Sequence, residues 1–330
     1  MSEDVQPWAQ KLIAGDRRTL ARSITKIEST RPDDQAWAEA VLDEVLPHTG
    51  GSIRLGITGT PGVGKSTFID ALGVQLIKQG NRVAVLAVDP SSNRTGGSIL
   101  GDKTRMANLS NRREAFIRPS PSGGLTGGVA RTTRDSLLLC EAAGFDVVIV
   151  ETMGVGQAET AVANICDLFL LLVAPGGGDD LQGIKRGIME LADVIGVNKA
   201  DGQLLGPANH TAADYRHALH LVRSKWPGMD TPVLTCSALT DDGLDELWAT
   251  IADLHDRLRT EGHLAALRSD QAVAHMTSEF ELLLADRVFR LPAFDKLRDR
   301  LEAEVRDGKR SPSSTAAELA RRAWRELGGL

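Results

Sequence analysis

The chain has 330 residues, enough for one large domain with extensions or for two domains. Hydrophobic residues make up 42% and charged residues 25%, as in ordinary globular proteins, and the net charge of −6 lacks the basic bias of nucleic-acid binding. No run approaches the roughly 20 apolar residues that span a bilayer, and the acidic start MSEDVQPWAQ lacks an apolar signal segment, so we expect a cytoplasmic protein without nucleic-acid or membrane partners.

Apolar residues at helical spacing predict an N-terminal helical extension over residues 1–50. The first such residues run from Val5 to Ile27, and a second helix is expected over Asp33–Leu46. The Gly50-Gly51 pair then ends the extension.

Residues 51–258 alternate short apolar runs with helical stretches. The predicted strands are Ile53–Thr58, Val83–Val88, Ala115–Arg118, Val147–Val150, Leu168–Val173, Val194–Asn198 and Val233–Ser237. The predicted helices are Ser66–Lys78, Gly128–Ala142, Gly183–Leu191, Ala208–Val222 and Gly243–Leu258. Continuously apolar strands are typical of a sheet that is covered on both faces, so we expect an α/β fold with a doubly wound, mostly parallel sheet.

After residue 259 the pattern predicts helices only, over Leu264–Phe289, Ala293–Val305 and Ser313–Leu327. This C-terminal extension, residues 259–330, is rich in charged residues. Its pattern fits a tail that packs on the preceding domain and fits an oligomerisation arm equally well.

Cysteines and histidines give no sign of a metal cluster. Cys140, Cys166 and Cys236 are widely separated in apolar or alanine-rich runs, which predicts buried reduced thiols. His255 lies in a polar helical stretch, and we expect it at the surface.

The strongest motif is the run Gly59-Thr-Pro-Gly-Val-Gly-Lys-Ser66, which matches G-x-x-x-x-G-K-[ST]. A predicted strand precedes it and a predicted helix follows it, so its backbone N–H groups and the helix dipole would face phosphates. Lys65 would reach the β- and γ-phosphates, and the Ser66 hydroxyl would bind Mg²⁺. The predicted nucleotide contacts in this loop are Gly59, Pro61, Gly62, Val63, Gly64, Lys65, Ser66 and Thr67.

The run Asn198-Lys199-Ala200-Asp201 follows a later predicted strand and matches a guanine reader. The carboxylate of Asp201 would accept from N1–H and the N2 amine of guanine, a donor pair that adenine lacks. Ser237-Ala238, at the end of the last predicted strand, would place a backbone N–H near guanine O6. The predicted ligands are therefore GTP and GDP.

Two acids end predicted strands at the edge where open α/β sheets bind ligands. Asp89 opens Asp-Pro-Ser-Ser, and Glu151 opens Glu-Thr-Met-Gly154, where many GTPases have D-x-x-G. Both fit Mg²⁺ as direct or water-mediated partners, Asp102 is a third candidate, and the Gly154 N–H would meet the γ-phosphate. A glycine-rich loop, 175–180, is typical of a mobile segment or of a plain surface loop.

Together these runs resemble the MeaB-type GTPases, the methylmalonyl-CoA mutase-associated family also known as ArgK or LAO/AO transport proteins. The runs that carry the resemblance are Gly59–Thr67, Val88–Ser92, Gly101–Met106, Ala115–Gly124, Glu151–Gln157, Ala174–Lys185 and Asn198–Asp201. Met153 and Ala158 replace the family's valine and serine, which are mild changes.

The resemblance implies a slow GTPase that acts as a chaperone of an adenosylcobalamin-dependent acyl-CoA mutase. Such a protein gates cofactor loading and protects or reactivates the mutase. It also implies that Asp89, Asp102 and Glu151 are the Mg²⁺-side acids, and that Gln182 and Lys185 stimulate hydrolysis from a segment that senses the mutase. The helical tail would form a homodimer.

Other classes fit the phosphate loop less fully. A metal-insertion GTPase would need clustered cysteines or histidines. A transport-linked kinase would need an acceptor pocket and a base, and no residues here identify either. A GTP-sensing module without useful hydrolysis also remains open.

Overall fold

The computed structural model describes residues 4–89, 105–121, 126–152, 158–176, 186–222, 224–289 and 292–326. It contains two compact units, residues 1–271 and 272–330.

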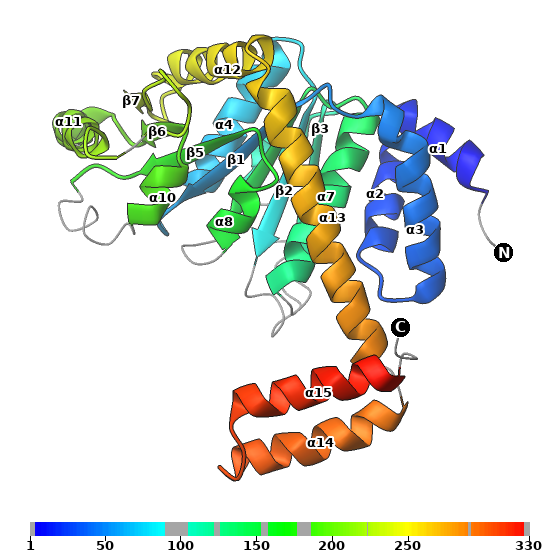
Figure 1. Cartoon of the computed structure of the whole chain (residues 1–330). Helices are drawn as coiled ribbons and strands as arrows, with labels where there is room; N and C mark the ends of the chain where they lie inside the picture. The colour runs from blue at the N-terminus through cyan, green and yellow to red at the C-terminus, as the bar shows by residue number, and fades with distance from the viewer. Residues whose placement is uncertain are drawn as a thin grey trace. The chain divides into compact units, whose positions relative to one another are not determined.

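A sheet of seven parallel strands forms the centre of the first unit, in the order β3-β2-β4-β1-β5-β6-β7 (Figure 1). The strands are β1 (Ile53–Gly59), β2 (Val83–Asp89), β3 (Ala115–Pro121), β4 (Val147–Thr152), β5 (Leu168–Val173), β6 (Val194–Val197) and β7 (Val233–Thr235). The chain moves outward from β1 in both directions, so the doubly wound parallel sheet expected from the sequence is confirmed.

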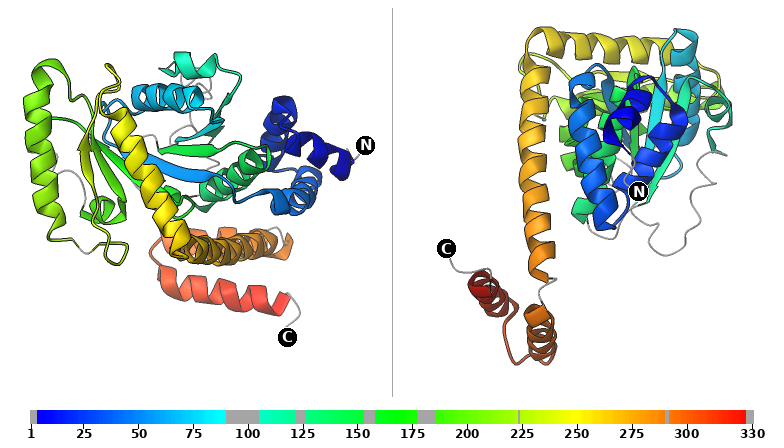
Figure 2. Two further views of the ribbon diagram at one scale, coloured as in Figure 1. Left: turned by 90° about the horizontal axis from the view of Figure 1, so that it is seen from above. Right: turned by 90° about the vertical axis from the view of Figure 1, so that its right-hand side faces the viewer.

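Helices cover both faces of the sheet and bury two separate apolar cores, which explains why the strands are mostly apolar (Figures 1 and 2). One core includes α7 (Thr126–Ala142), α8 (Ala158–Ala163), α10 (Arg186–Leu191) and α11 (Leu205–Leu219). The other includes α4 (Lys65–Lys78), α6 (Ala107–Ser110), α12 (Leu244–Thr260) and the start of α13 (His263–Phe289). Short 3₁₀ turns lie at Leu46–His48 and Gly202–Leu204.

Three N-terminal helices, α1 (Val5–Ile13), α2 (Arg17–Ile27) and α3 (Pro32–Val45), join the first of these cores. The chain turns at Gly15, whose φ is +82°, and the Asp16 side chain then caps α2 by accepting from the Thr19 N–H at 2.7 Å. Trp8 and Trp37 pack edge to face with 5.3 Å between ring centroids, which locks α1 onto α3.

The second unit holds the rest of α13 together with α14 (Pro292–Arg306) and α15 (Pro312–Glu326). Phe289 and Phe294 pack with 5.9 Å between ring centroids, and Arg310 bonds to Glu318 at 2.6 Å. Helix α13 carries an exposed apolar stripe at helical spacing. The stripe consists of Val273, Met276, Phe280, Leu283 and Leu284.

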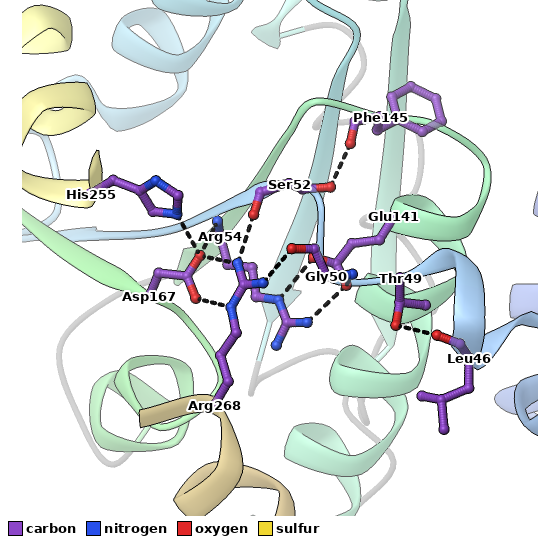
Figure 3. A network of polar contacts seen from close by, with 10 residues as sticks. All are labelled: Leu46, Thr49, Gly50, Ser52, Arg54, Glu141, Phe145, Asp167, His255 and Arg268. Atoms are coloured by element: carbon purple, nitrogen blue, oxygen red, sulfur yellow. Dashed lines mark hydrogen bonds and ion pairs between the residues drawn. The ribbon is translucent and has the colours of Figure 1, made fainter. Parts of the chain in front are cut away.

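A buried charge network lies at the amino ends of β1 and β5, the edge of the sheet opposite the phosphate loop (Figure 3). Arg54 of β1 donates from Nε and Nη2 to the two oxygens of Glu141 on α7, at 3.0 and 2.8 Å. Asp167, just before β5, accepts from the Arg54 N–H at 2.9 Å and from the Arg268 side chain of α13.

His255 of α12 is only 9% exposed, and its Nε2 lies 3.5 Å from Oδ2 of Asp167, so the prediction of a surface histidine is wrong. The reason is helical geometry. His255 lies four residues after Ile251 and three before Leu258, both fully buried, so it shares their face of α12.

The cysteine prediction is confirmed: all three are free and buried, and burial raises the pKa of the Cys236 thiol to about 12. Within the described part of the chain, no helix has the length and apolarity that a bilayer crossing requires.

Candidate nucleotide site

The phosphate loop connects β1 to α4 in the strand–loop–helix order that the motif predicts. At Gly59 a Cβ atom would lie 2.3 Å from the carbonyl oxygen of Leu172 on β5, so only glycine fits there. Gly64 caps α4 with φ of +91°, a left-handed conformation that also favours glycine. Helix α4 therefore begins at Lys65, directly after the loop. The positive N-terminal end of its dipole faces the position expected for the phosphates.

Lys65 is 9% exposed, and its Nζ donates to the carbonyls of Gly59 at 2.6 Å and Thr60 at 3.4 Å. Burial lowers the pKa of Lys65, while the nearby acids Glu151 and Glu159 partly offset that effect. The ammonium group is thus held inside the loop, where it can neutralise phosphate charge.

The Mg²⁺ candidates come together in part. Ser66 Oγ lies 3.3 Å from Oε1 of Glu151, which is 1% exposed at the end of β4. A hydroxyl and a carboxylate side by side fit the oxygen preference of Mg²⁺. Ala87 of β2 pairs with Glu151 in the sheet, so the backbone of Asp89 lies two residues further along the neighbouring strand.

Four predicted site residues lie outside the described residues: Asp102, Gly154, Gln182 and Lys185. For Asp89 the structure describes the backbone but not the side chain.

The guanine reader lies directly against the phosphate loop. Asn198 follows β6; its Nδ2 donates to the Val63 carbonyl at 2.9 Å, and its Oδ1 accepts from the Ala238 N–H at 3.1 Å. Lys199, with φ of +61°, extends across the loop, and its Nζ donates to the Gly62 carbonyl at 2.6 Å. The two halves of the predicted site therefore form one hydrogen-bonded frame.

Ser237 orients the carboxylate of Asp201. The Ser237 hydroxyl is fully buried and donates to Oδ2 of Asp201 at 2.5 Å. The hydroxyl oxygen in turn accepts from the N–H groups of Leu239 and Thr240, both at 3.2 Å. These bonds fix the direction of the Asp201 carboxylate, which the recognition of a donor pair requires.

Sequence reasoning missed three buried residues near this site, Glu159 and the pair Thr58 and Thr152. Glu159, on α8 and fully buried, acts electrostatically on Lys65. Thr58 and Thr152 join the ends of β1 and β4 through their hydroxyls at 2.8 Å. Glu159 could have been noticed as the one acid in Ala158–Ala163, a run of otherwise small or apolar residues.

The comparisons with known proteins agree with this geometry. Residues 20–293 match the model of the family described as "Methylmalonyl Co-A mutase-associated GTPase MeaB". GTPase ArgK of Escherichia coli is 47% identical over 316 residues, with 94% of each chain covered. The mouse protein named methylmalonic aciduria type A homolog, mitochondrial, is 41% identical, covering 95% of this chain and 78% of that protein.

A crystal structure of an LAO/AO transport system kinase superposes with a TM-score of 0.75 at 39% identity, with 96% of each chain covered. The family match spans most of the chain, and the relatives cover nearly all of it. The chain is therefore a GTP-binding GTPase that belongs to the MeaB/ArgK family of methylmalonyl-CoA mutase-associated GTPases.

Proposed function

We propose that this GTPase is a Mg²⁺-dependent chaperone of an adenosylcobalamin-dependent acyl-CoA mutase, methylmalonyl-CoA mutase or a relative. In this role it gates cofactor loading and protects or reactivates the mutase. The observation that carries the proposal is the family match over residues 20–293, since the family is named for its association with that mutase.

The chain's own residues have distinct parts in GTP hydrolysis. Asp201 binds the guanine base, Asn198 holds the frame around it through Val63 and Ala238, and the loop N–H groups with Lys65 bind the β- and γ-phosphates. Ser66 and Glu151 would hold Mg²⁺, and Asp89 and Asp102 are proposed as further acids for the ion. When bound, Mg²⁺ neutralises charge that develops on the phosphate oxygens. Bringing these groups into one frame lets positioning and electrostatics supply most of the catalysis.

Gln182 and Lys185 would couple hydrolysis to the mutase. Both lie in the segment between β5 and α10. This segment begins just after Leu172, whose carbonyl oxygen lies beside Gly59 of the phosphate loop. A partner that binds this segment would add charge and hydrogen bonds at the nucleotide only while it is bound, so we propose that basal turnover is slow and partner-stimulated.

We also propose a homodimer through α13. The exposed stripe on this helix holds Met276 and Phe280, each 64% exposed, and four-residue spacing places them on one helix face. A contiguous apolar face of this kind is typical of a protein interface. It lies within the extension 259–330, which the resemblance leads us to expect as the dimerisation arm.

The decisive experiment measures GTP turnover by the purified protein, alone and with an adenosylcobalamin-dependent acyl-CoA mutase from the same source. We expect slow turnover that the mutase accelerates, and Lys185→Ala should lose the acceleration while retaining the basal rate. Basal turnover without any response to the mutase would contradict the client assignment. Transfer of phosphate to a small acceptor instead of water would favour a transport-linked kinase.

A further inference from the structure

Thr58 and Thr152 form a hydrogen-bonded pair inside the core, between the ends of β1 and β4. The Thr152 hydroxyl donates to the Thr58 hydroxyl at 2.8 Å, and both residues are fully buried. The ladder between these strands pairs Ile57 with Glu151, so the two threonines are the next residues along it. Successive side chains of a strand point to opposite faces, so the hydroxyls lie on the face of the sheet opposite to the Glu151 side chain.

The threonine pair is a polar exception in an apolar layer. Val150 precedes Thr152 by two residues on the same face, and Val88 of β2 pairs with Thr152 in the sheet; both valines are buried in the first core. Two apolar side chains of the same shape could replace a buried hydroxyl pair at little cost in stability. Packing alone therefore does not require threonines here, whereas a hydrogen bond adds a directional contact between the two strands.

On β1 the pair adjoins the phosphate loop. Thr58 directly precedes Gly59, whose carbonyl accepts from Lys65 Nζ at 2.6 Å. The strand on the other side, β5, packs against the same glycine, because a Cβ atom at Gly59 would lie 2.3 Å from the Leu172 carbonyl oxygen. The start of the loop is thus held between β5 and, through the threonine hydroxyls, β4.

On β4 the pair adjoins the acid proposed for Mg²⁺. Thr152 directly follows Glu151, whose Oε1 lies 3.3 Å from Ser66 Oγ on the phosphate-loop helix α4. Mg²⁺ demands near-ideal octahedral geometry at about 2.1 Å. A hydroxyl from α4 and a carboxylate from β4 can therefore share one ion only if the loop and the strand are held in register.

We propose that Thr58 and Thr152 are positioning residues whose hydrogen bond holds Glu151 in register with the phosphate loop, so that Glu151 and Ser66 serve the same Mg²⁺ ion. The proposal rests on the proposed Mg²⁺-dependent GTPase mechanism. Because both threonines are fully buried on the opposite face of the sheet, they act through the backbone of the residues beside them and not by contact with the ion.

The test is the affinity of the full chain for a fluorescent GDP analogue, titrated with MgCl₂ and compared with the affinity in EDTA. Thr152→Val keeps the shape of the side chain and removes its hydroxyl. It should raise the Mg²⁺ concentration for half-maximal strengthening of GDP binding about fivefold, the equivalent of one neutral hydrogen bond. The affinity in EDTA should stay at the wild-type value, because the phosphate loop keeps its contact with β5.

Thr152→Ser is the matched control at the same position, since it removes a buried methyl group and keeps the hydroxyl. It should lower the thermal unfolding midpoint and retain the wild-type Mg²⁺ response. Ser52→Ala, just before β1 at its opposite end, removes a buried hydroxyl that donates to the Phe145 carbonyl, and should do the same. If Thr152→Val shifts the Mg²⁺ response no more than these two variants, the pair is merely structural and the proposal is wrong.

The double variant Thr58→Val with Thr152→Val separates stability from positioning. Each single valine variant leaves one buried hydroxyl without its partner, whereas the double variant leaves none and should recover much of the unfolding midpoint. The shifted Mg²⁺ response should persist in the double variant, and a response that recovers together with the midpoint would refute the positioning role. Should Thr152→Val fail to fold, the double variant carries the same test.

The wild-type titration distinguishes failure of this proposal from failure of the proposed function. Wild type that binds GDP equally well with and without Mg²⁺ would overturn the Mg²⁺ mechanism and this proposal together. A normal wild-type response that Thr152→Val leaves unshifted would overturn the positioning role alone.

Discussion

The guanidinium of Arg268 donates to both carboxylate oxygens of Asp167, from Nε to Oδ1 at 2.8 Å and from Nη2 to Oδ2 at 2.7 Å (Figure 3). The same group donates to the carbonyls of Gly50 at 2.6 Å and Ser52 at 2.7 Å. One side chain of α13 therefore binds the residues that precede β1 and β5. These two strands lead to the phosphate loop and to the proposed mutase-sensing segment.

Replacing Arg268 should destabilise the first unit strongly. The Asp167 side chain is fully buried, and removing one partner of a buried ion pair costs about 3–5 kcal/mol. We expect the free energy of unfolding to fall by that amount in Arg268→Ala, measured by urea unfolding followed by tryptophan fluorescence. Arg268→Lys should lose less, because it keeps the charge but cannot bind both carboxylate oxygens as a planar guanidinium does. Arg259→Ala is the control, since its pair with Asp256 is more than half exposed and should contribute under about 1 kcal/mol. Equal effects of the two alanine variants would refute the assignment.

The same pair predicts a pH dependence of the free energy of unfolding. Burial alone would raise the pKa of Asp167, but the hydrogen bonds and charge of Arg268, with the His255 imidazole nearby, outweigh it and hold the pKa below its usual value. Ionised Asp167 therefore stabilises the fold fully above its unfolded pKa of about 3.9, and this contribution is lost as pH falls through the lower folded pKa. The difference in unfolding free energy between wild type and Asp167→Asn should shrink below about pH 3.9. A difference that stays constant from pH 7 to pH 3 would contradict this.

The sequence predicted the parts of this molecule that are marked locally. Nearly all the strands are continuous apolar runs, and the phosphate loop and guanine reader are short motifs at strand ends, so their places could be predicted from local sequence. Helix α11 was predicted three residues late, over Ala208–Val222, whereas it begins at Leu205 and has Pro207 in its first turn. Proline is tolerated in the first turn of a helix, because the N–H groups there make no hydrogen bond within the helix.

Long-range polar partners could not be predicted in the same way. Asp167 and Arg268 are 101 residues apart, and Asp70 and Leu109 are 39 apart; no spacing rule relates such pairs. Their contact depends on which helix covers which strand. The alternation of strands and helices in the sequence does not determine that arrangement. Glu159 was missed for a similar reason. Its role depends on its closeness to Lys65, which lies on another element.

Ser237 should strengthen guanine binding by orienting Asp201, while Asp201 itself should set the base preference of the nucleotide site. Ser237→Ala removes the bond that orients Asp201 and should weaken GTP binding about five- to tenfold, without creating affinity for xanthosine triphosphate. Asp201→Asn should instead shift preference toward the xanthosine nucleotide, because the amide can donate where the carboxylate only accepts. Competition with a fluorescent guanine nucleotide measures both effects. Thr240→Ala is the control, since its hydroxyl bonds to Asp242 at 2.7 Å and not to Asp201. A Ser237→Ala variant with unchanged affinity would show that Asp201 needs no such support.

Helix α13 should hold two copies of the chain together through its exposed stripe. In a symmetric dimer each stripe residue is buried twice, and burying a large apolar side chain contributes about 1.5–3 kcal/mol. The double variant Met276→Glu with Phe280→Glu should therefore dissociate the dimer at micromolar concentration in analytical ultracentrifugation, because it removes that burial and brings like charges together. Ser278→Glu adds a charge to the opposite side of the same helix, at an exposed position, and should leave the dimer intact. Wild type that sediments as a monomer, or a double variant that stays dimeric, would rule out α13 as the dimer contact. A monomeric variant with normal basal GTP turnover would show that the nucleotide site is complete within one chain.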